Sequence, residues 1–354
     1  MPAADPHGAL TTRPILATIL FINALNIPCQ GSGIGIAKLE ENEVGNAVTR
    51  HQPPFGGIWP AMVTPFDGDD RLNLRAARRL VNHLIAQGAG GLYVCGSTGE
   101  APLLDVSERE ALTECVTEEV RGRVPVIAQV GHTSPRNAVA LARHAARCGA
   151  DAISSVLPPF YVYTTEQVVG YWSELTEASG LPFYGYIMHD VGSSLDTVRR
   201  WVEAIRKVPG LVGLKFTFAD PYPISLLKEC SNGELNILSG SDQGFLGARS
   251  HGADGAIGSS YNVALPLWLH ACRLHDTGRA AEATFAMQRC AAVVGRFLLG
   301  YFLTRIKLVL RRQGIDCGLP RPPLRANVEI PANEIDELVR LIAADDLGLG
   351  RACA

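Results

Sequence analysis

The sequence predicts an α/β fold, a (β/α)8 TIM barrel followed by a C-terminal helical extension. From Gly57 onward, short runs rich in branched and aromatic residues alternate with stretches of helical period, which is typical of strand–helix units around a parallel sheet. Eight such apolar runs can be counted, and eight strands close a barrel of this kind. A length of 354 residues fits a barrel of about 250 residues with additions at its ends.

Each expected strand is a short apolar run bounded by glycine, proline or polar residues. The strands are expected at residues 58–64, 91–95, 124–130, 152–156, 182–187, 212–216, 236–239 and 255–257. In such barrels the reactive side chains lie at the carboxyl ends of the strands, so a site is expected there.

The first helices between these strands have recognisable start and stop signals. Asn73 suits the residue before a helix, and Pro135 suits a first helical position. Ser107, followed three residues later by Glu110, matches a capping box. The glycines expected to end helices are Gly88, Gly149 and Gly180.

After Ile257 the alternation ends and only helical stretches follow, expected at about 265–277, 279–298, 299–313 and 332–344. The expected organisation is an N-terminal extension (1–55), a catalytic barrel (56–262) and a C-terminal helical extension (263–354). Residues 14–28 are apolar and follow Arg13, like the centre of a secretory signal, but they are too short to span a bilayer and no clear cleavage site follows. Residues 1–55 are therefore either a targeting segment or a disordered addition.

The composition favours small-molecule partners. A net charge of −3 with 19% charged residues gives no general affinity for nucleic acid or anionic membranes. The nine cysteines are odd in number and never spaced as Cys-x-x-Cys, which argues against a disulfide framework and against a zinc site. A reduced cytoplasmic location is the simplest expectation.

Lys215 is the first candidate for chemistry, because it stands alone in the apolar run Gly-Leu-Lys-Phe-Thr. A lysine inside a strand either pairs with a carboxylate or loses its proton, and a neutral amine is a nucleophile that forms a Schiff base with a ketone. The alternative is a structural lysine whose stem is buried. Thr217 lies two residues later and therefore faces the same way.

The end of the second expected strand, Cys-Gly-Ser-Thr-Gly-Glu at 95–100, is the second candidate. Its glycines allow a tight turn, and the adjacent hydroxyls of Ser97 and Thr98 suit a carboxylate. The alternative is a plain turn in which Glu100 caps the next helix.

Other strand ends carry further polar groups. Tyr186 shares a strand face with Tyr184 and is either a proton shuttle beside the lysine or a core tyrosine. Asp242 is either a ligand for a polyol or the cap of the next helix. Ser259 lies in a glycine- and hydroxyl-rich turn.

Taken together, these motifs resemble the N-acetylneuraminate lyase family, within the pyruvate-dependent aldolases that include dihydrodipicolinate synthase. The resemblance runs from Gly56 to Arg325 with the motifs in the family's order. It implies that Lys215 forms the Schiff base, that Tyr186 relays protons, and that Ser97 and Thr98 hold the pyruvate carboxylate. It also implies a set of further substrate-binding residues, namely Tyr161, Thr217, Gly240, Asp242 and Ser259.

The activity implied by the resemblance is cleavage of a 2-keto-3-deoxy sugar acid, above all N-acetylneuraminate, to pyruvate and N-acetylmannosamine. The family uses no metal and no cofactor apart from the covalent Schiff base. The resemblance also implies that the chain assembles into a homotetramer. The nearest alternative is an aldolase or dehydratase acting on another 2-keto-3-deoxy sugar acid.

Three positions depart from the family or divide it. Dihydrodipicolinate synthase has an arginine where this chain has Val191, and an aliphatic side chain cannot bind the carboxylate of an amino acid. His189 adds a titratable group that either faces the substrate or points to solvent. Gln243 replaces a glutamate of the lyases, which leaves the sugar open.

Two alternatives of other classes also stay open. A metal enzyme using His189, Asp190 and Asp242 is disfavoured, because their spacing is not that of a ligand set. A sugar-acid binding protein without catalysis is the second.

Overall fold

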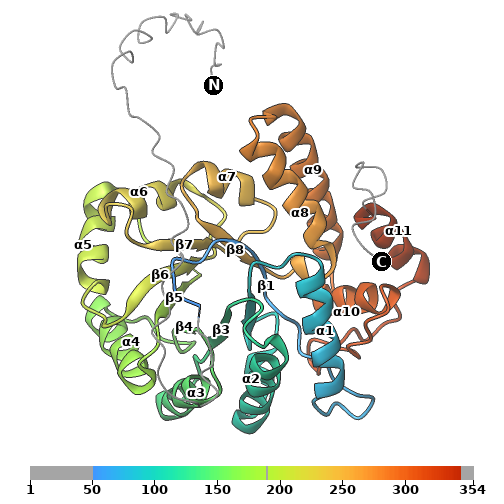
Figure 1. Ribbon diagram of the computed structural model, residues 1–354, viewed down its shortest axis with the longest axis horizontal. Coiled ribbons are helices and arrows are strands. Elements are labelled where there is room, and N and C mark those ends of the chain that lie inside the picture. The colour runs from blue at the N-terminus through green and yellow to red at the C-terminus, as the bar shows by residue number, and fades with distance from the viewer. Residues whose placement is uncertain (1–50, 189, 344–354) are drawn as a thin grey trace, which may run out of the picture. The chain divides into compact units, whose positions relative to one another are not determined.

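The computed structural model describes residues 51–188 and 190–343, so the expectations for residues 1–50 and for His189 lie outside the described part. Its parallel strands form one sheet in the order β1-β8-β7-β6-β5-β4-β3-β2. A further parallel bridge between Ala61 and Tyr93 joins the ends of that order. The eight-stranded barrel is therefore confirmed, with helices around it (Figure 1).

The strands occupy the expected places, with shorter bounds at several ends. They are β1 (Gly57–Pro60), β2 (Leu92–Val94), β3 (Val126–Gln129), β4 (Ala152–Val156), β5 (Phe183–Ile187), β6 (Leu211–Phe216), β7 (Asn236–Ser239) and β8 (Gly255–Gly258). The helices of the barrel are α1 (Leu74–Ala86), α2 (Val106–Val120), α3 (Pro135–Arg147), α4 (Thr165–Ser179), α5 (Leu195–Ile205), α6 (Tyr222–Cys230) and α7 (Phe245–Ser250), with a short 3-10 turn at Ala101–Leu103.

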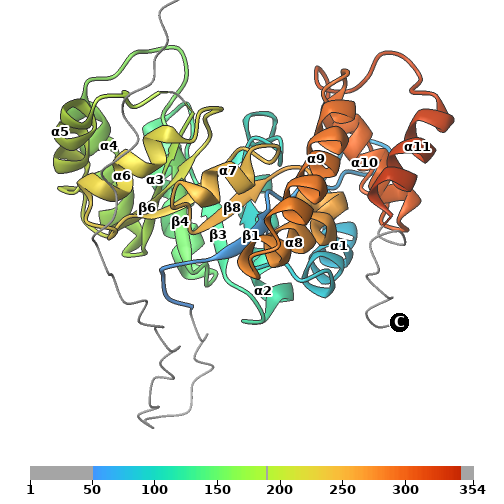
Figure 2. The same ribbon diagram turned by 90° about the horizontal axis from the view of Figure 1, so that it is seen from above.

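The C-terminal helices are α8 (Tyr261–Asp276), α9 (Ala280–Phe297), α10 (Phe302–Arg312) and α11 (Ala332–Ile342). Helix α8 begins four residues earlier than expected. Ala264 interrupts it with non-helical backbone angles, just before Pro266, because proline disfavours helical geometry in the residues before it. Seen from above, α9, α10 and α11 lie together at one side of the barrel, beside α1 (Figure 2).

The helix starts agree with the sequence at two positions and differ at a third, and Gly180 ends α4 as expected. Asn73 accepts a hydrogen bond from the Ala76 amide, and Pro135 begins α3. The capping box of α2, however, is formed by Asp105 and Glu108 rather than by Ser107 and Glu110. Two overlapping matches occur in the sequence, and the chain enters the helix at the first of them, so Ser107 is already in the first turn.

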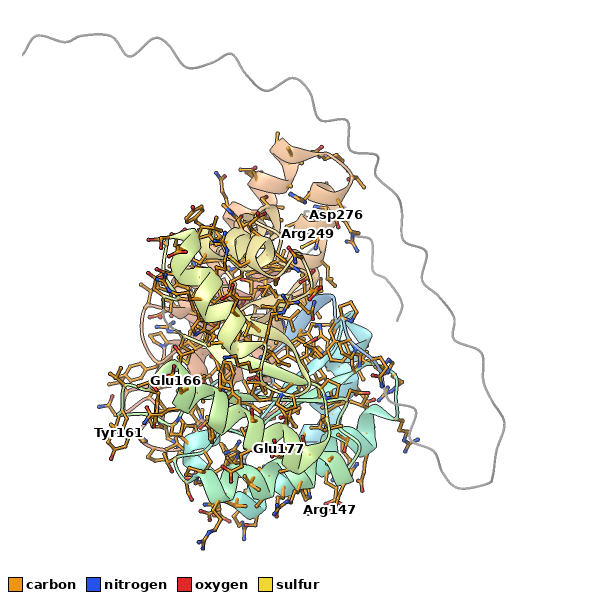
Figure 3. All side chains as sticks on the ribbon, turned by 90° about the vertical axis from the view of Figure 1, so that its left-hand side faces the viewer. Arg147, Tyr161, Glu166, Glu177, Arg249 and Asp276 are labelled. Atoms are coloured by element: carbon orange, nitrogen blue, oxygen red, sulfur yellow. The ribbon has the colours of Figure 1, made fainter. Side chains whose placement is uncertain are left out.

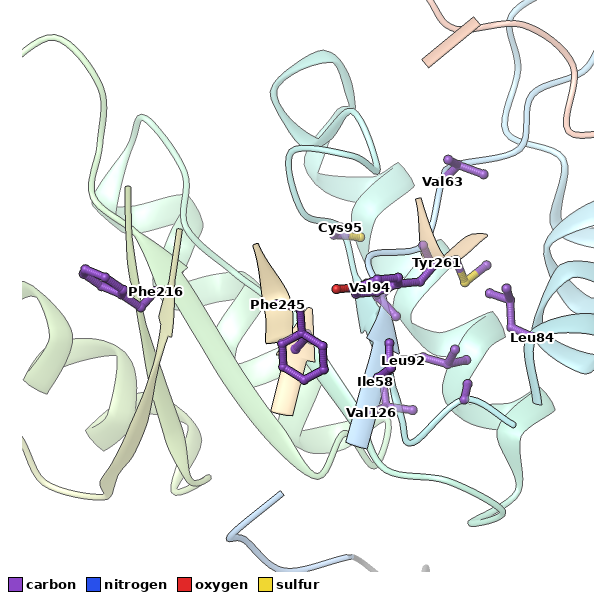
Figure 4. Close-up of a cluster of buried hydrophobic side chains, with 14 of the residues drawn as sticks. Ile58, Val63, Leu84, Leu92, Val94, Cys95, Val126, Phe216, Phe245 and Tyr261 are labelled. Carbon is purple, nitrogen blue, oxygen red and sulfur yellow. The ribbon is translucent and has the colours of Figure 1, made fainter. Parts of the chain in front are cut away.

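Two buried layers follow from the alternation of side chains along the strands. One side chain set faces the helices and forms the larger cluster, part of which is seen around Ile58, Leu84 and Leu92 (Figure 4). The other set fills the barrel and includes Trp59, Tyr93 and Tyr184. The division between residues 55 and 56 and that between 262 and 263 stay predictions.

Phe55 closes the amino-terminal end of the barrel interior. Its ring lies 5.2 Å from the ring of Trp59 and 5.7 Å from that of Tyr184. The Phe55 amide donates to the Asn236 side-chain oxygen at 3.0 Å, and the Asn236 side-chain nitrogen donates to the Phe55 carbonyl at 3.0 Å. The Tyr184 hydroxyl donates to the same Asn236 side chain at 2.6 Å. The polar groups at the bottom of the barrel are thereby satisfied around an aromatic plug.

Within the described residues, none of the helices combines the length and the apolar character that a membrane crossing needs. The described residues also contain no group of three or more histidine, cysteine, aspartate or glutamate side chains placed to hold a metal ion.

Candidate active site

An irregularity in β6 aims Lys215 into the barrel. Phe183 pairs with Leu211 and Tyr184 pairs with Gly213, so Val212 is an extra residue in β6. Such a bulge changes which side chains face inward. The next pairs bring Tyr186 opposite Lys215, so the two residues lie side by side on neighbouring strands.

The amine of Lys215 lies between two aromatic rings. Its Nζ is 4.1 Å from the ring centroid of Tyr93 and 4.1 Å from that of Tyr186. The side chain is buried, with 4% of its surface exposed. The lysine–carboxylate ion pairs found among the described residues involve Lys228 and Lys307 instead. Lys215 is therefore a buried amine without a paired carboxylate in the part of the chain that the structure describes.

Burial lowers the pKa of Lys215, because the charged form loses its hydration. The nearby Tyr186 and Asp242 oppose this effect, but the pKa stays below the ordinary value of 10.5. An amine that gives up its proton more easily is a better nucleophile at neutral pH.

Tyr186 shows the complementary effect. Burial alone would raise the pKa of its hydroxyl, but the charge of Lys215 and the hydroxyl groups of Ser97 and Thr217 lower it further than burial raises it. The net pKa lies below the ordinary value of 10.0. A phenol of this kind gives up its proton more readily than a free tyrosine, so more of it is present as the phenolate base at neutral pH.

Thr217 and Gly240 are packed against each other at the ends of β6 and β7. A Cβ atom on residue 240 would lie 1.7 Å from the Thr217 hydroxyl oxygen, so only glycine fits. The Thr217 hydroxyl oxygen is buried and makes no hydrogen bond of normal geometry within the described residues, although it lies near enough to the Tyr186 hydroxyl to lower its pKa. A buried polar atom without a partner costs free energy unless a ligand satisfies it, so this hydroxyl is a candidate contact for substrate.

The loop after β2 brings two hydroxyl groups to the barrel mouth. Cys95 and Glu100 bound the loop with φ angles of 56° and 58°. Ser97 between them is exposed, and Thr98 is buried with its Oγ1 2.5 Å from the Ser259 Oγ at the end of β8. The loop therefore links Ser97, Thr98 and Ser259 into one polar rim.

Glu100 does not cap the helix that follows. It precedes the 3-10 turn at Ala101–Leu103 but forms no side-chain cap there. Its Oε1 instead lies 2.7 Å from the Nζ of Lys307 on α10, and its Oε2 accepts from the Arg321 amide at 2.8 Å. The loop is therefore fixed from the C-terminal helices.

Asp242 is not a helix cap either, because α7 is preceded by Gly244. Its Oδ2 accepts from the amide and the hydroxyl of Ser260, at 2.8 and 2.5 Å. Burial raises its pKa, against the lowering effect of the Ser260 hydrogen bonds and of the charge of Lys215. A Cβ atom on Gly258 would overlap the other carboxylate oxygen at 1.8 Å. Asp242 thus joins the ends of β7 and β8 close to the lysine.

Two expected site residues are exposed instead of buried with Lys215. Gln243 is exposed. Tyr161 is 77% exposed on the loop between β4 and α4, at the surface of the molecule (Figure 3). The centroid of its ring lies 6.4 Å from that of Tyr163. Tyr161 lines an apolar cavity of about 410 Å³ together with Pro159 and Tyr171. His189, which follows β5, lies outside the described residues.

The structure adds residues that sequence reasoning did not single out. Tyr93 faces the amine, and alternation along β2 would have found it, because Leu92 and Val94 face the helices. Lys307 carries no local signal, since its partner Glu100 is 207 residues away in the chain.

The fold and this cluster define the class of the protein: a (β/α)8 barrel with a buried lysine of lowered pKa at the carboxyl end of its sheet. The chain belongs to the dihydrodipicolinate synthetase family, which matches residues 54–343. The resemblance seen in the sequence is thereby confirmed.

Individual relatives narrow the comparison. The chain is 34% identical over 258 residues to the N-acetylneuraminate lyase of Citrobacter koseri, an alignment that covers 72% of this chain and 85% of the relative. The sialic acid aldolase structure from Ruminococcus gnavus aligns with a TM-score of 0.77 at 27% identity, over 81% of this chain and 97% of that one. A dihydrodipicolinate synthase structure from Bacillus anthracis aligns with a TM-score of 0.73 at 28% identity, over 81% and 97%.

Proposed function

We propose that the protein is a carbon–carbon lyase, a class I aldolase that cleaves N-acetylneuraminate to pyruvate and N-acetylmannosamine. The observation that carries the proposal is the position of the Lys215 amine, buried next to Tyr186 and, among the described residues, unpaired with a carboxylate. The family and its lyase relatives support it.

In the first step the Lys215 nitrogen attacks the C2 ketone of the substrate. The resulting carbinolamine loses water and leaves a positively charged iminium, which serves as the electron sink. Ser97 and Thr98 hold the substrate carboxylate at the loop after β2. No metal or other cofactor is required, because the iminium supplies the electron sink itself.

Formation of the iminium consumes the Tyr186 proton as water leaves, so in the second step the Tyr186 phenolate takes the proton of the C4 hydroxyl. The electrons of the C3–C4 bond move into the iminium, so that the aldehyde sugar leaves and an enamine of pyruvate stays on Lys215. Tyr186 then returns the proton to C3, and water hydrolyses the iminium to pyruvate and free amine. The lowered pKa of Tyr186 supports this exchange of protons.

The sugar chain is proposed to bind along the ends of β6, β7 and β8. The buried Thr217 hydroxyl, which makes no hydrogen bond of normal geometry within the described residues, supports this placement, as does the proximity of Ser259 to Thr98. Gly240, Asp242 and Gln243 complete the proposed surface. Tyr161 and His189 are proposed to contribute from the loops after β4 and β5.

Val191 argues against dihydrodipicolinate synthase activity. Its side chain is buried in the core layer, with 7% exposed. The amino-acid substrate of that synthase requires a cation for its carboxylate at this position, and a buried aliphatic group supplies none.

The Schiff base is tested by reduction. Borohydride added with pyruvate should attach a pyruvate-derived mass to Lys215, located by peptide mass spectrometry. An unmodified Lys215 under saturating pyruvate would exclude the mechanism. Pyruvate release from a panel of 2-keto-3-deoxy sugar acids then tests the sugar, and N-acetylneuraminate should give the highest kcat/KM.

A homotetramer in the cytoplasm is also proposed. The resemblance of the sequence supports the assembly, and the scattered cysteines support a reduced compartment. Light scattering of the purified chain and cell fractionation test the two statements separately.

A further inference from the structure

The aromatic surroundings of the Lys215 nitrogen are unusual for a charged group. The rings of Tyr93 and Tyr186 lie 6.3 Å apart with 87° between their planes, and the nitrogen lies over both of them at 4.1 Å. The Tyr93 side chain is fully buried, and its hydroxyl donates to the Ser154 Oγ at 3.1 Å. The ring is therefore held in place from the side away from the amine.

The need for such surroundings changes during the proposed reaction. A free lysine in a dry site can relieve its burial by releasing its proton. The iminium cannot, because its positive charge is what draws the electrons of the breaking bond. The nearest carboxylate that influences Lys215 is Asp242, which is already engaged by the amide and hydroxyl of Ser260. Apart from the substrate's own carboxylate, the groups that face the iminium nitrogen directly are the two rings.

We propose that Tyr93 stabilises the iminium of Lys215 through a cation–π interaction. The face of its ring provides this stabilisation, and its hydroxyl does not. The inference rests on the proposed Schiff-base function. Ring faces attract cations most strongly in desolvated sites, and here the Lys215 side chain is 4% exposed and the Tyr93 side chain is fully buried. Tyr186 offers the second face but also handles protons, so Tyr93 is the position where the electrostatic effect can be isolated.

The decisive experiment varies the ring electrons without varying the shape of the side chain. Residue 93 is replaced by phenylalanine and by phenylalanines carrying one, two and three ring fluorines, which weaken the negative ring face stepwise. Tyr93→Phe should keep activity within about threefold of wild type, because the ring face is retained. Along the fluorine series, kcat should fall steadily by a total on the order of 10- to 30-fold. The fraction of Lys215 trapped by borohydride at subsaturating pyruvate should fall in parallel.

A second readout separates this effect from a structural one. Because the rings also stabilise the ammonium form, each fluorine should move the acid limb of kcat/KM to lower pH. The matched control is the same series at Tyr184, which is equally buried but whose ring stacks on Phe55. That series should leave both the trapping and the acid limb unchanged.

The outcomes test the role of Tyr93 separately from the proposed lyase function. A flat response to fluorine at position 93, in protein that still traps pyruvate at Lys215, overturns the role of Tyr93 and leaves the lyase proposal standing. Failure of the wild-type protein to trap pyruvate overturns both.

Discussion

Glu100 and Lys307 form an ion pair in which both side chains are 0% exposed, with 2.7 Å between Nζ and Oε1. The pair joins the loop that carries Ser97 and Thr98 to helix α10 of the C-terminal extension. Leu319 adds a carbonyl at 3.3 Å from the same nitrogen, and the ring of Phe66 lies 4.4 Å below it. The extension therefore takes part in shaping the barrel mouth.

Removing one partner of this pair should be costly. In Lys307→Met the Glu100 carboxylate stays buried without its cation, so the free energy of unfolding should fall by about 3–5 kcal/mol. The KM for the sugar acid should rise as the loop loosens. Urea denaturation and steady-state kinetics measure the two effects.

The double variant Glu100→Gln/Lys307→Met should recover most of that stability, because no uncompensated charge remains. Arg71→Met is the matched control, since Arg71 pairs with Asp67 and Asp69 at an exposed site and should cost no more than about 1 kcal/mol. Equal losses of unfolding free energy in Arg71→Met and Lys307→Met would show that burial of the Glu100–Lys307 pair does not increase its contribution.

Stability should depend on pH through Lys215. Its pKa is lower in the folded protein than the ordinary 10.5 because of burial. Between the folded pKa and 10.5 the unfolded chain binds more protons, so the free energy of unfolding rises with pH in that window. The ammonium form, present below the folded pKa, carries the cost of burial.

Lys215→Met removes this cost, so the variant should exceed wild type in stability at pH 7. Its advantage should shrink toward pH 10.5, with a slope of at most about 1.4 kcal/mol per pH unit. Urea denaturation of both proteins across this range measures the difference. A difference that is constant with pH would show that Lys215 has an ordinary pKa.

Tyr186→Phe should separate the two halves of the reaction. The variant keeps the ring beside Lys215, so pyruvate trapping by borohydride should persist. Cleavage should fall at least ~100-fold, because the proton of the C4 hydroxyl has no acceptor. Tyr184→Phe is the control: it loses the hydrogen bond to Asn236 and about 1 kcal/mol of stability, but not activity. Near-normal turnover of Tyr186→Phe would remove its assigned role.

Thr217 and Gly240 should be coupled. Gly240→Ala places a methyl group within 1.7 Å of the Thr217 hydroxyl oxygen and should displace that side chain, lowering kcat/KM for the sugar acid by tenfold or more (about 1.4 kcal/mol). Thr217→Ala in the same chain removes the hydroxyl overlap but leaves the β-carbon of residue 217 at 2.7 Å, so the double variant should recover part of the lost stability yet still be weak toward the sugar. Additive losses of stability in the double variant would argue against direct contact.

The sequence predicted the barrel well because each strand is a local apolar run with its own boundaries. It also placed Lys215 and Tyr186 on adjacent strands in the order that the register bears out. The bulge at Val212 could not be predicted from the sequence, because an extra residue in β6 is defined only by the pairing of β6 with β5. Lys307 was missed for a similar reason, since nothing on α10 indicates a partner near residue 100. The capping box of α2 was assigned two residues late. The sequence contains two overlapping matches to the motif, and the helix begins at the first of them.

The aromatic cluster around Phe55 closes the amino-terminal end of the barrel, so Lys215 is reached from the carboxyl end of the strands. Whatever reaches Lys215 must enter past the loops after β2 and β8, and both products must leave by the same route. The pyruvate fragment is bonded to the lysine at the inner end, so the aldehyde has to depart first. In the reverse direction pyruvate has to load before the aldehyde. The covalent bond at the inner end and the single route thereby order product release, so pyruvate should compete with the sugar acid for the free Lys215 amine and the aldehyde should not.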